Sequence, residues 1–155
     1  LMALIGGLVG FGFAWAIAGR LEWADASLGC IFGSIALMYF HLVNFENIMP
    51  DAQAGARTWA TRAGFDASKT FFFFTAGLVF VTTVVHVSFL ERDLRLSPVL
   101  LVEVMAMIPV IMRVRALKSP LSSEITGLRW SAVRLSWLTV IALAGGYLLV
   151  MKSAL

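Results

Sequence analysis

Three side chains that carry oxygen atoms, Asn44, Asn47 and Asp51, are spaced three and four residues apart in the sequence. Residues at this spacing lie on one face of a helix. Amide and carboxylate oxygens are ligands of hard cations, and Mg²⁺ in particular is held by one or two carboxylates together with the phosphates of a substrate. The spacing therefore indicates a candidate site for Mg²⁺ and a phosphate compound.

Two arginines follow this set and add to the same chemistry. Gly55 allows a tight turn, and Arg57 and Arg62 then supply planar, permanently charged groups that suit phosphate oxygens. Pro50 argues against a single helix, because it disfavours the helical conformation at the residue before it. The prediction of a shared helical face therefore holds only for Asn44 and Asn47. On spacing alone, a solvated loop of mixed charge is the simpler interpretation.

The composition around this loop is that of a membrane protein. Of the 155 residues, 60% are hydrophobic and 14% are charged, whereas soluble domains have roughly 45–50% apolar and about 25% charged residues. The net charge is only +3, and the basic residues are scattered rather than gathered into a patch with aromatic residues. Nucleic acid is therefore excluded as a partner, and the lipid bilayer is expected as the surroundings.

Apolar segments of the length that a helix needs to cross hydrocarbon recur along the chain. They lie at about 1–19, 27–43, 71–90, 97–112 and 135–151. The sequence thus predicts an all-α, multi-pass transmembrane helical bundle that occupies residues 1–155 as one domain. Asp66 or Ser68 is expected to cap the third of these helices. The connections alternate between short and long, so the two long loops are expected at the same end.

The distribution of basic residues predicts the orientation, because cytoplasmic loops carry an excess of Lys and Arg. The end with the long loops has Arg57, Arg62, Lys69, Arg113, Arg115, Lys118, Arg129 and Arg134, and the other end has Arg20, Arg92, Arg95 and Lys152. This excess places the motif loop, residues 44–70, in the cytoplasm. We expect an integral protein of a bacterial-type inner or plasma membrane.

The run NFENIMPDAQAGARTWATRAG resembles the second aspartate-rich motif of the UbiA superfamily of intramembrane prenyltransferases, N..D...D...G.RTL..RLG. The matching residues are Asn44, Asp51, Gly55, Arg57, Thr58, Arg62 and Gly64. The lead-in of His41 and Asn44 looks most like the menaquinone-biosynthesis branch. Proteins of this superfamily have nine transmembrane helices with one motif after helix two and one after helix six. The resemblance implies that these five helices correspond to helices 5 to 9, with the first motif outside the chain.

The resemblance also implies an activity, namely transfer of a polyprenyl group from its diphosphate to an aromatic acceptor in quinone biosynthesis. Its partners would be these two substrates, and its cofactor would be Mg²⁺. Asp51 would be a metal ligand, and Arg57 would contact the diphosphate together with Asn44 and Arg62. The resemblance assigns no catalytic residue.

One departure from the motif leaves a second function open. Asn47 stands where the family has the earlier aspartate, so it is a neutral ligand, although the adjacent Glu46 offers a negative charge as a further metal ligand. Weaker metal binding leads to the alternative of a catalytically degenerate UbiA-like structural or accessory subunit of a larger membrane complex. A small five-helix transporter or redox protein is a third interpretation.

Two ionisable residues, His86 and Glu103, lie within the third and fourth apolar segments. Ionisable groups are costly at this depth and are candidates for function. Both are close to the same short turn, so we expect them to form a structural pair across this hairpin.

Overall fold

The computed structural model describes Leu8, Gly12, Trp15 and residues 23–91 and 94–152. All regular elements in this part of the chain are helical. The long helices are α2 (Trp23–Glu46), α5 (Phe65–Val85), α6 (Ser97–Ala116) and α7 (Leu128–Lys152). Between them lie the short helices α3 (Ile48–Gln53) and α4 (Trp59–Ala63), the π-helical turn η1 (His86–Glu91) and the 3-10 turns η2 (Leu94–Leu96) and η3 (Ser123–Ile125).

Among the described residues, four helices are long and apolar enough to cross a membrane: Trp23–Glu46, Phe65–Phe89, Ser97–Ala116 and Leu128–Val150. The prediction of an all-helical bundle with helices suited to a membrane is thereby confirmed. The predicted helix at 1–19 lies outside the described residues except for three isolated positions, so the count of five stays a prediction. The observed helices extend beyond the apolar segments at the end of the bundle where α2 and α6 end and α5 and α7 begin, because these turns carry polar residues.

The predicted cap of the third helix is wrong. The helix begins at Phe65 with Gly64 as the N-cap residue, at a φ of 86°. Glycine adopts this conformation without the steric cost of a Cβ atom. Asp66 instead lies in the first turn, where a negative charge is favourable beside the helix N-terminus, and Ser68 is buried.

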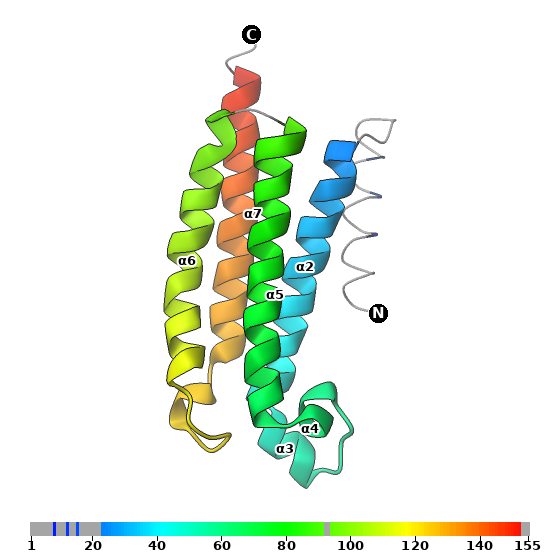
Figure 1. The fold of residues 1–155 in the computed structure, drawn as a ribbon, viewed down its shortest axis with the longest axis vertical. Coiled ribbons are helices and arrows are strands. Elements are labelled where there is room, and N and C mark those ends of the chain that lie inside the picture. The colour runs from blue at the N-terminus through cyan, green and yellow to red at the C-terminus, as the bar shows by residue number, and fades with distance from the viewer. Residues whose placement is uncertain (1–7, 9–11, 13–14, 16–22, 92–93, 153–155) are drawn as a thin grey trace.

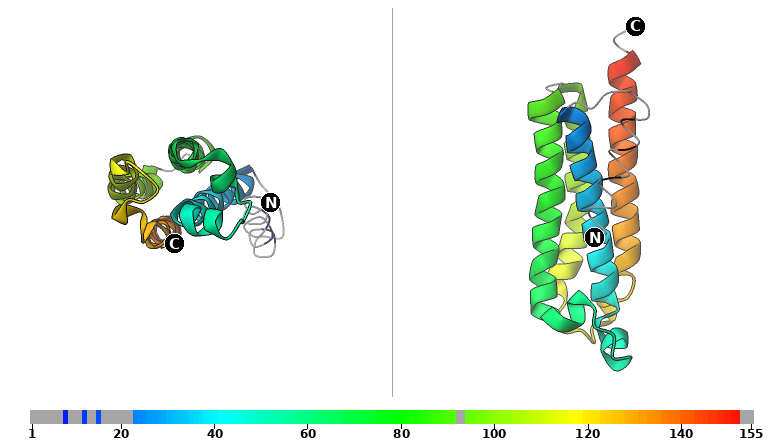
Figure 2. Two further views of the ribbon diagram at one scale, coloured as in Figure 1. Left: turned by 90° about the horizontal axis from the view of Figure 1, so that it is seen from below. Right: turned by 90° about the vertical axis from the view of Figure 1, so that its right-hand side faces the viewer.

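The long helices run alternately up and down and form one bundle (Figures 1 and 2). Helix α2 packs against α5 and α7, and α6 packs against the same two helices. The segment with α3 and α4 and the connection with η3 lie at one end, which we call the loop end. The connection with η1 and η2 lies at the opposite end, which we call the turn end. The prediction that both long loops share one end of the bundle is confirmed.

The centre of the bundle is apolar and closely packed. Ile31, Met38 and Phe45 of α2 are fully buried, as are Phe72 and Val79 of α5. The apolar side chains of α6 and α7 are more exposed, as expected for helices whose outer faces contact lipid. Because lipid is as apolar as these side chains, close packing rather than exclusion of water holds such helices together.

One close approach between helices requires glycine. A Cβ atom on Gly146 of α7 would lie 2.9 Å from Cδ2 of Leu96 and 3.1 Å from Cγ2 of Val99. A Cβ atom added to the adjacent Gly145 would have no such neighbour within 4 Å. Gly146 therefore lets α7 pack against η2 and the start of α6 at the turn end.

We expect Gly146→Val to destabilise the protein by about 1–3 kcal/mol relative to Gly145→Val, because only the first overfills a packed contact. Both variants carry the same penalty for a β-branched residue in a helix, so their difference isolates the packing term. Reversible unfolding in detergent with a circular dichroism readout measures it. Equal stability of the two variants would show that the contact is loose.

Candidate functional site

The predicted ligand residues lie where α2 passes into α3. Only Asn47 separates the two helices, and the hydrogen bonds continue through it: the N–H of Asn47 donates to the carbonyl of Val43 at 3.1 Å, and the N–H of Asp51 donates to the carbonyl of Asn47 at 2.8 Å. Pro50 lies in the first turn of α3, where its missing N–H is tolerated. Asn44, Asn47 and Asp51 therefore keep a nearly helical spacing despite the proline.

These three side chains are only partly buried. Within the described ranges, none of them forms a hydrogen bond or an ion pair through its side chain. The same holds for Arg57 and Arg62, which are exposed. We call Asn44, Asn47, Asp51, Arg57 and Arg62 the uncommitted set. Its oxygen atoms and guanidinium groups are available to bind a ligand.

Local backbone geometry places Arg57 between α3 and α4. Gly55 adopts a φ of 70°, and the N–H of Ala56 closes the end of α3 on the carbonyl of Asp51 at 2.8 Å. Thr58 then caps α4 by accepting a hydrogen bond from the N–H of Thr61 at 3.3 Å. The segment from Gly55 to Arg62 thus forms a turn and a capped helix, which has Arg62 in its last turn.

Helix α4 is held against the bundle by an aromatic cluster. The ring of Trp59 lies edge-on to His41, with 5.3 Å between ring centroids, and its centroid is 4.6 Å from that of Phe71. His41 is buried, and its Nε2 contacts the carbonyl oxygen of Ser68 at 2.8 Å as the hydrogen-bond donor. His41 therefore positions the motif segment and is not itself part of the exposed site.

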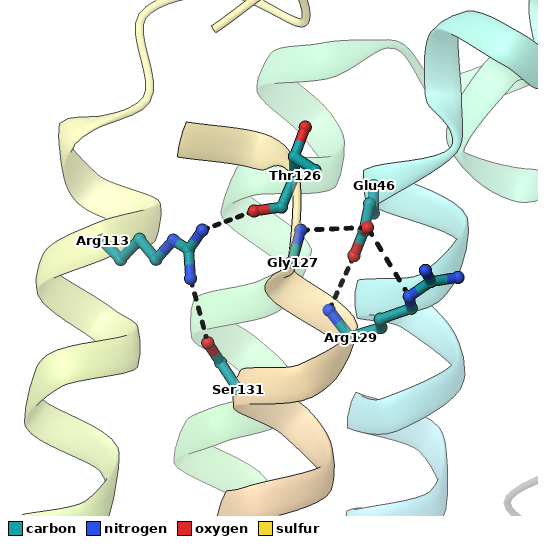
Figure 3. A network of polar contacts seen from close by, with 6 residues as sticks. All are labelled: Glu46, Arg113, Thr126, Gly127, Arg129 and Ser131. Carbon is teal, nitrogen blue, oxygen red and sulfur yellow. Dashed lines mark hydrogen bonds and ion pairs between the residues drawn. The ribbon is translucent and has the colours of Figure 1, made fainter. Parts of the chain in front are cut away.

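Glu46, a further predicted metal ligand, binds the N-terminus of α7 (Figure 3). Oε1 accepts a hydrogen bond from the N–H of Gly127 at 3.0 Å, and Oε2 accepts one from the N–H of Arg129 at 2.8 Å. Nε of Arg129 lies 3.8 Å from Oε1. The first N–H groups of a helix have no partner within the helix and favour a negative charge. Metal binding by Glu46, which stays a prediction, would compete with these contacts.

Arg113 of α6 makes a second connection to the start of α7 (Figure 3). Its Nη2 donates to the carbonyl of Thr126 at 2.5 Å, and its Nη1 donates to Oγ of Ser131 at 3.3 Å. Glu46 and Arg113 thus hold the same turn from two different helices. Figure 3 shows the two side chains on opposite sides of Gly127.

Lys69 of α5 satisfies the end of α6. Its Nζ donates to the carbonyl of Arg115 at 2.8 Å and to that of Leu117 at 2.7 Å. Carbonyls in the last turn of a helix lack intrahelical partners, and a cation is favourable there. In the sequence, Lys69, Arg113 and Arg129 are recognisable only as basic residues on one face, because the groups that they contact are distant in the sequence.

An apolar groove lies between α2 and α7 and ends close to the uncommitted set. It has a volume of about 520 Å³ and is lined by Phe32, Ile35, Ala36, Tyr39, Phe40, Val133, Ser136, Trp137 and Val140. Ala36, Phe40 and Asn44 are four residues apart on α2, so they share a helical face. The same face of α2 therefore changes from the apolar wall of a groove to polar ligand atoms at the loop end.

The oxygen atoms of Asn44, Asn47 and Asp51 suit a Mg²⁺ site that is completed by a substrate, and not one formed by the protein alone. Among the described residues, no three His, Cys, Asp or Glu side chains are close enough together to hold a metal ion. Asp51 with the amide oxygens of Asn44 and Asn47 supplies one carboxylate and two neutral ligands. Mg²⁺ retains waters and completes its octahedron with substrate phosphates, so this partial set is compatible with it.

Comparison with known protein families, curated proteins and solved structures found no match to this chain.

We expect Glu46→Ala to destabilise the protein by about 1–3 kcal/mol, because it removes a charged acceptor from two backbone N–H groups. Hydrogen exchange followed by mass spectrometry should show faster exchange in residues 125–131. Asp51→Asn is the control, since Asp51 has no partner among the described residues. Unchanged exchange at the start of α7 in Glu46→Ala would contradict the role assigned to Glu46.

Proposed function

We propose that the protein is an intramembrane prenyltransferase that moves a polyprenyl group from its diphosphate to an aromatic acceptor, in quinone biosynthesis. The observation that carries the proposal is the face of α2 on which the apolar groove meets the uncommitted set. A polyprenyl diphosphate has the same two parts, a long apolar chain and a compact anionic head. Asn44 lies four residues beyond Phe40 on this face, about 6 Å along the helix axis.

The polar side chains at the loop end fall into two groups, those that bind backbone atoms and those that have no partner in the described structure. This difference supports the same proposal. Glu46, Lys69 and Arg113 each bind backbone atoms and build the bundle. Asn44, Asn47 and Asp51 lie among them with no such role, although polar groups in partly buried positions usually find partners within the protein. Side chains that the fold itself does not use are the ones available to a ligand.

In this function the chain positions the donor through three contacts. Arg57 and Arg62 bind phosphate oxygens with permanently charged, planar donors. The groove between α2 and α7 takes up the first part of the prenyl chain and excludes water from it. The aromatic rings of Phe40 and Trp137 in the groove present faces that attract positive charge developing on the allylic carbon.

Mg²⁺, when bound by Asp51 with Asn47 and Asn44, would neutralise negative charge on the departing diphosphate. The orientation of these side chains depends on the junction of α2 with α3, which Glu46 ties to α7. Glu46 therefore acts here as a positioning residue.

A structural or accessory role in a membrane complex is the second candidate function. It is favoured by the same contact of Glu46, because a carboxylate held by two N–H groups and Arg129 contributes less charge to a metal. Asp51 is then the only carboxylate of the uncommitted set with no competing contact. The face of α2 would bind a partner protein or lipid and would catalyse no reaction.

We expect the full-length protein to consume a long-chain polyprenyl diphosphate in a reaction that requires Mg²⁺ and an aromatic acceptor such as 1,4-dihydroxy-2-naphthoate. Asp51→Asn and Arg57→Ala should each lower kcat/KM by about 100-fold, because they remove electrostatic stabilisation of the leaving group. The matched controls are Asp66→Asn and Lys118→Ala, exposed charges at the same end. Absence of both turnover and Mg²⁺-dependent diphosphate binding in the unmodified protein would reject the enzyme and favour the accessory subunit.

The groove gives a separate prediction about donor length. Ala36→Phe should raise KM for long polyprenyl donors more than for short ones, because the new ring fills part of the groove. Gly77→Phe is the control, since it places the same ring in the groove between α5 and α6, which has a volume of about 300 Å³. If both variants shift the length preference equally, the groove between α2 and α7 does not bind the prenyl chain.

A further inference from the structure

A group of polar side chains links the helices near the turn end, far from the candidate diphosphate site. Elsewhere in the described spans, Ser and Thr hydroxyls mostly bond to their own helix, as Ser34 does with the carbonyl of Cys30 and Ser136 with that of Ala132. At the turn end, contacts instead join different helices. The residues are Ser27 of α2, Thr83 of α5, His86 of η1, Glu103 of α6 and Tyr147 of α7, which we call the turn-end cluster.

His86 is fully buried and contacts two hydroxyls. Its Nδ1 lies 2.5 Å from Oγ of Ser27, and its Nε2 lies 2.6 Å from the hydroxyl of Tyr147. Oγ of Ser27 also donates to the carbonyl of Ala24 at 2.7 Å. Since the one hydroxyl proton of Ser27 goes to the carbonyl of Ala24, Nδ1–H of His86 is the donor to Oγ of Ser27. Both ring nitrogens of His86 are therefore in use.

Glu103 forms one hydrogen bond through its carboxyl group. Oγ1 of Thr83 lies 3.0 Å from the carbonyl of Val79 and 3.3 Å from Oε1 of Glu103, and the Thr83 hydroxyl is the donor in both contacts. Its single proton is shared between these two acceptors, so the bond to Oε1 is weak. Glu103 therefore receives little compensation for its burial.

The other oxygen of Glu103 has no such contact. Glu103 is fully buried, and Oε2 has no hydrogen-bond partner among the residues that the structure describes. An ionised carboxylate with an unpaired oxygen is far more costly in an apolar bundle than a neutral acid with an unpaired hydroxyl. Burial and the unpaired oxygen thus favour the acid form.

The proton of Glu103 lies near an aqueous boundary. Thr83 and His86 are three residues apart, so they face the same side of the helix, and η1 ends five residues beyond His86 at Glu91. In the described elements at this end, the other titratable groups are Asp25 in the first turn of α2, Glu91 at the end of η1, Arg95 in η2 and Lys152 at the end of α7. Along α2, Ser27 and Asn44 are about 25 Å apart, so the cluster does not contact the diphosphate site.

We propose that the turn-end cluster is a proton-binding site within the membrane, in which Glu103 holds a proton that exchanges with water at the turn end past His86 and Tyr147. Exchange needs only a water or hydronium ion as the partner: the acid releases its proton to water, and the carboxylate takes one from hydronium. This property is independent of the proposed prenyl transfer, which takes place at the loop end.

Infrared difference spectroscopy of the full-length protein in lipid tests the proposal. At neutral pH we expect a carbonyl stretching band of a protonated carboxylic acid that is lost in Glu103→Gln. The band should shift in D₂O, and His86→Phe should slow that shift while leaving the band in place. Absence of such a band, or a Glu103 band that does not shift in D₂O, would overturn the proposal.

A second variant serves if Glu103→Gln does not fold. Thr83→Val has nearly the same shape and removes the hydroxyl that donates to the carbonyl oxygen Oε1 of Glu103, so the band should move to higher frequency. Thr82→Val is the matched control, because Oγ1 of Thr82 donates to the carbonyls of Leu78 and Val79 and not to Glu103. An identical band in Thr83→Val and the unmodified protein would contradict the assigned hydrogen bond.

Discussion

The hydrogen bonds from the start of α7 to the carboxylate of Glu46 are the contact on which the loop end depends. A helix that enters the membrane presents unpaired N–H groups at its first turn, and here a side chain at the end of α2 accepts two of them. This contact sets α7 beside α2 and so forms the groove between them. It also fixes the last turn of α2, from which Asn44 projects, and Asn47 directly after it. The groove and these two polar residues therefore share one support.

Much of this arrangement follows from the sequence, since apolar length identifies the helices and alternating loop lengths place the motif and the second long loop together. The helical spacing of Asn44 and Asn47 expected from the sequence is also found in the structure, since Pro50 lies in the first turn of α3, where a helix tolerates it. Other features could not be predicted from the sequence. Glu46 and Gly127 are 81 residues apart, and no local pattern indicates that pairing. The N-cap residue of α5 was not predicted, because Gly64 suits that position through its backbone angles, whereas the expectation was based on polar side chains.

The two ends of the bundle provide partners for their polar groups with different chemistry. At the loop end, full charges on Glu46, Lys69 and Arg113 bind backbone groups of helix termini, where water moderates the cost of charge. At the turn end, Thr83, His86 and Glu103 are buried and Tyr147 is partly buried. The direct pair of His86 with Glu103 expected from the sequence is wrong: His86 contacts Ser27 and Tyr147, whereas Glu103 contacts Thr83. Ionisable residues at this depth thus differ in role from those at the surface.

Gly127 and Gly146 fix α7 against its neighbours at two levels, the first beneath Glu46 and the second against Leu96 and Val99. The interval between them is about 28 Å along the helix axis, close to the hydrocarbon thickness of a typical bilayer, about 30 Å. A helix pinned at both levels cannot slide when the bilayer becomes thicker or thinner. Hydrophobic mismatch would then be met by tilting the whole bundle or deforming the surrounding lipid, which keeps the groove and its polar end in register.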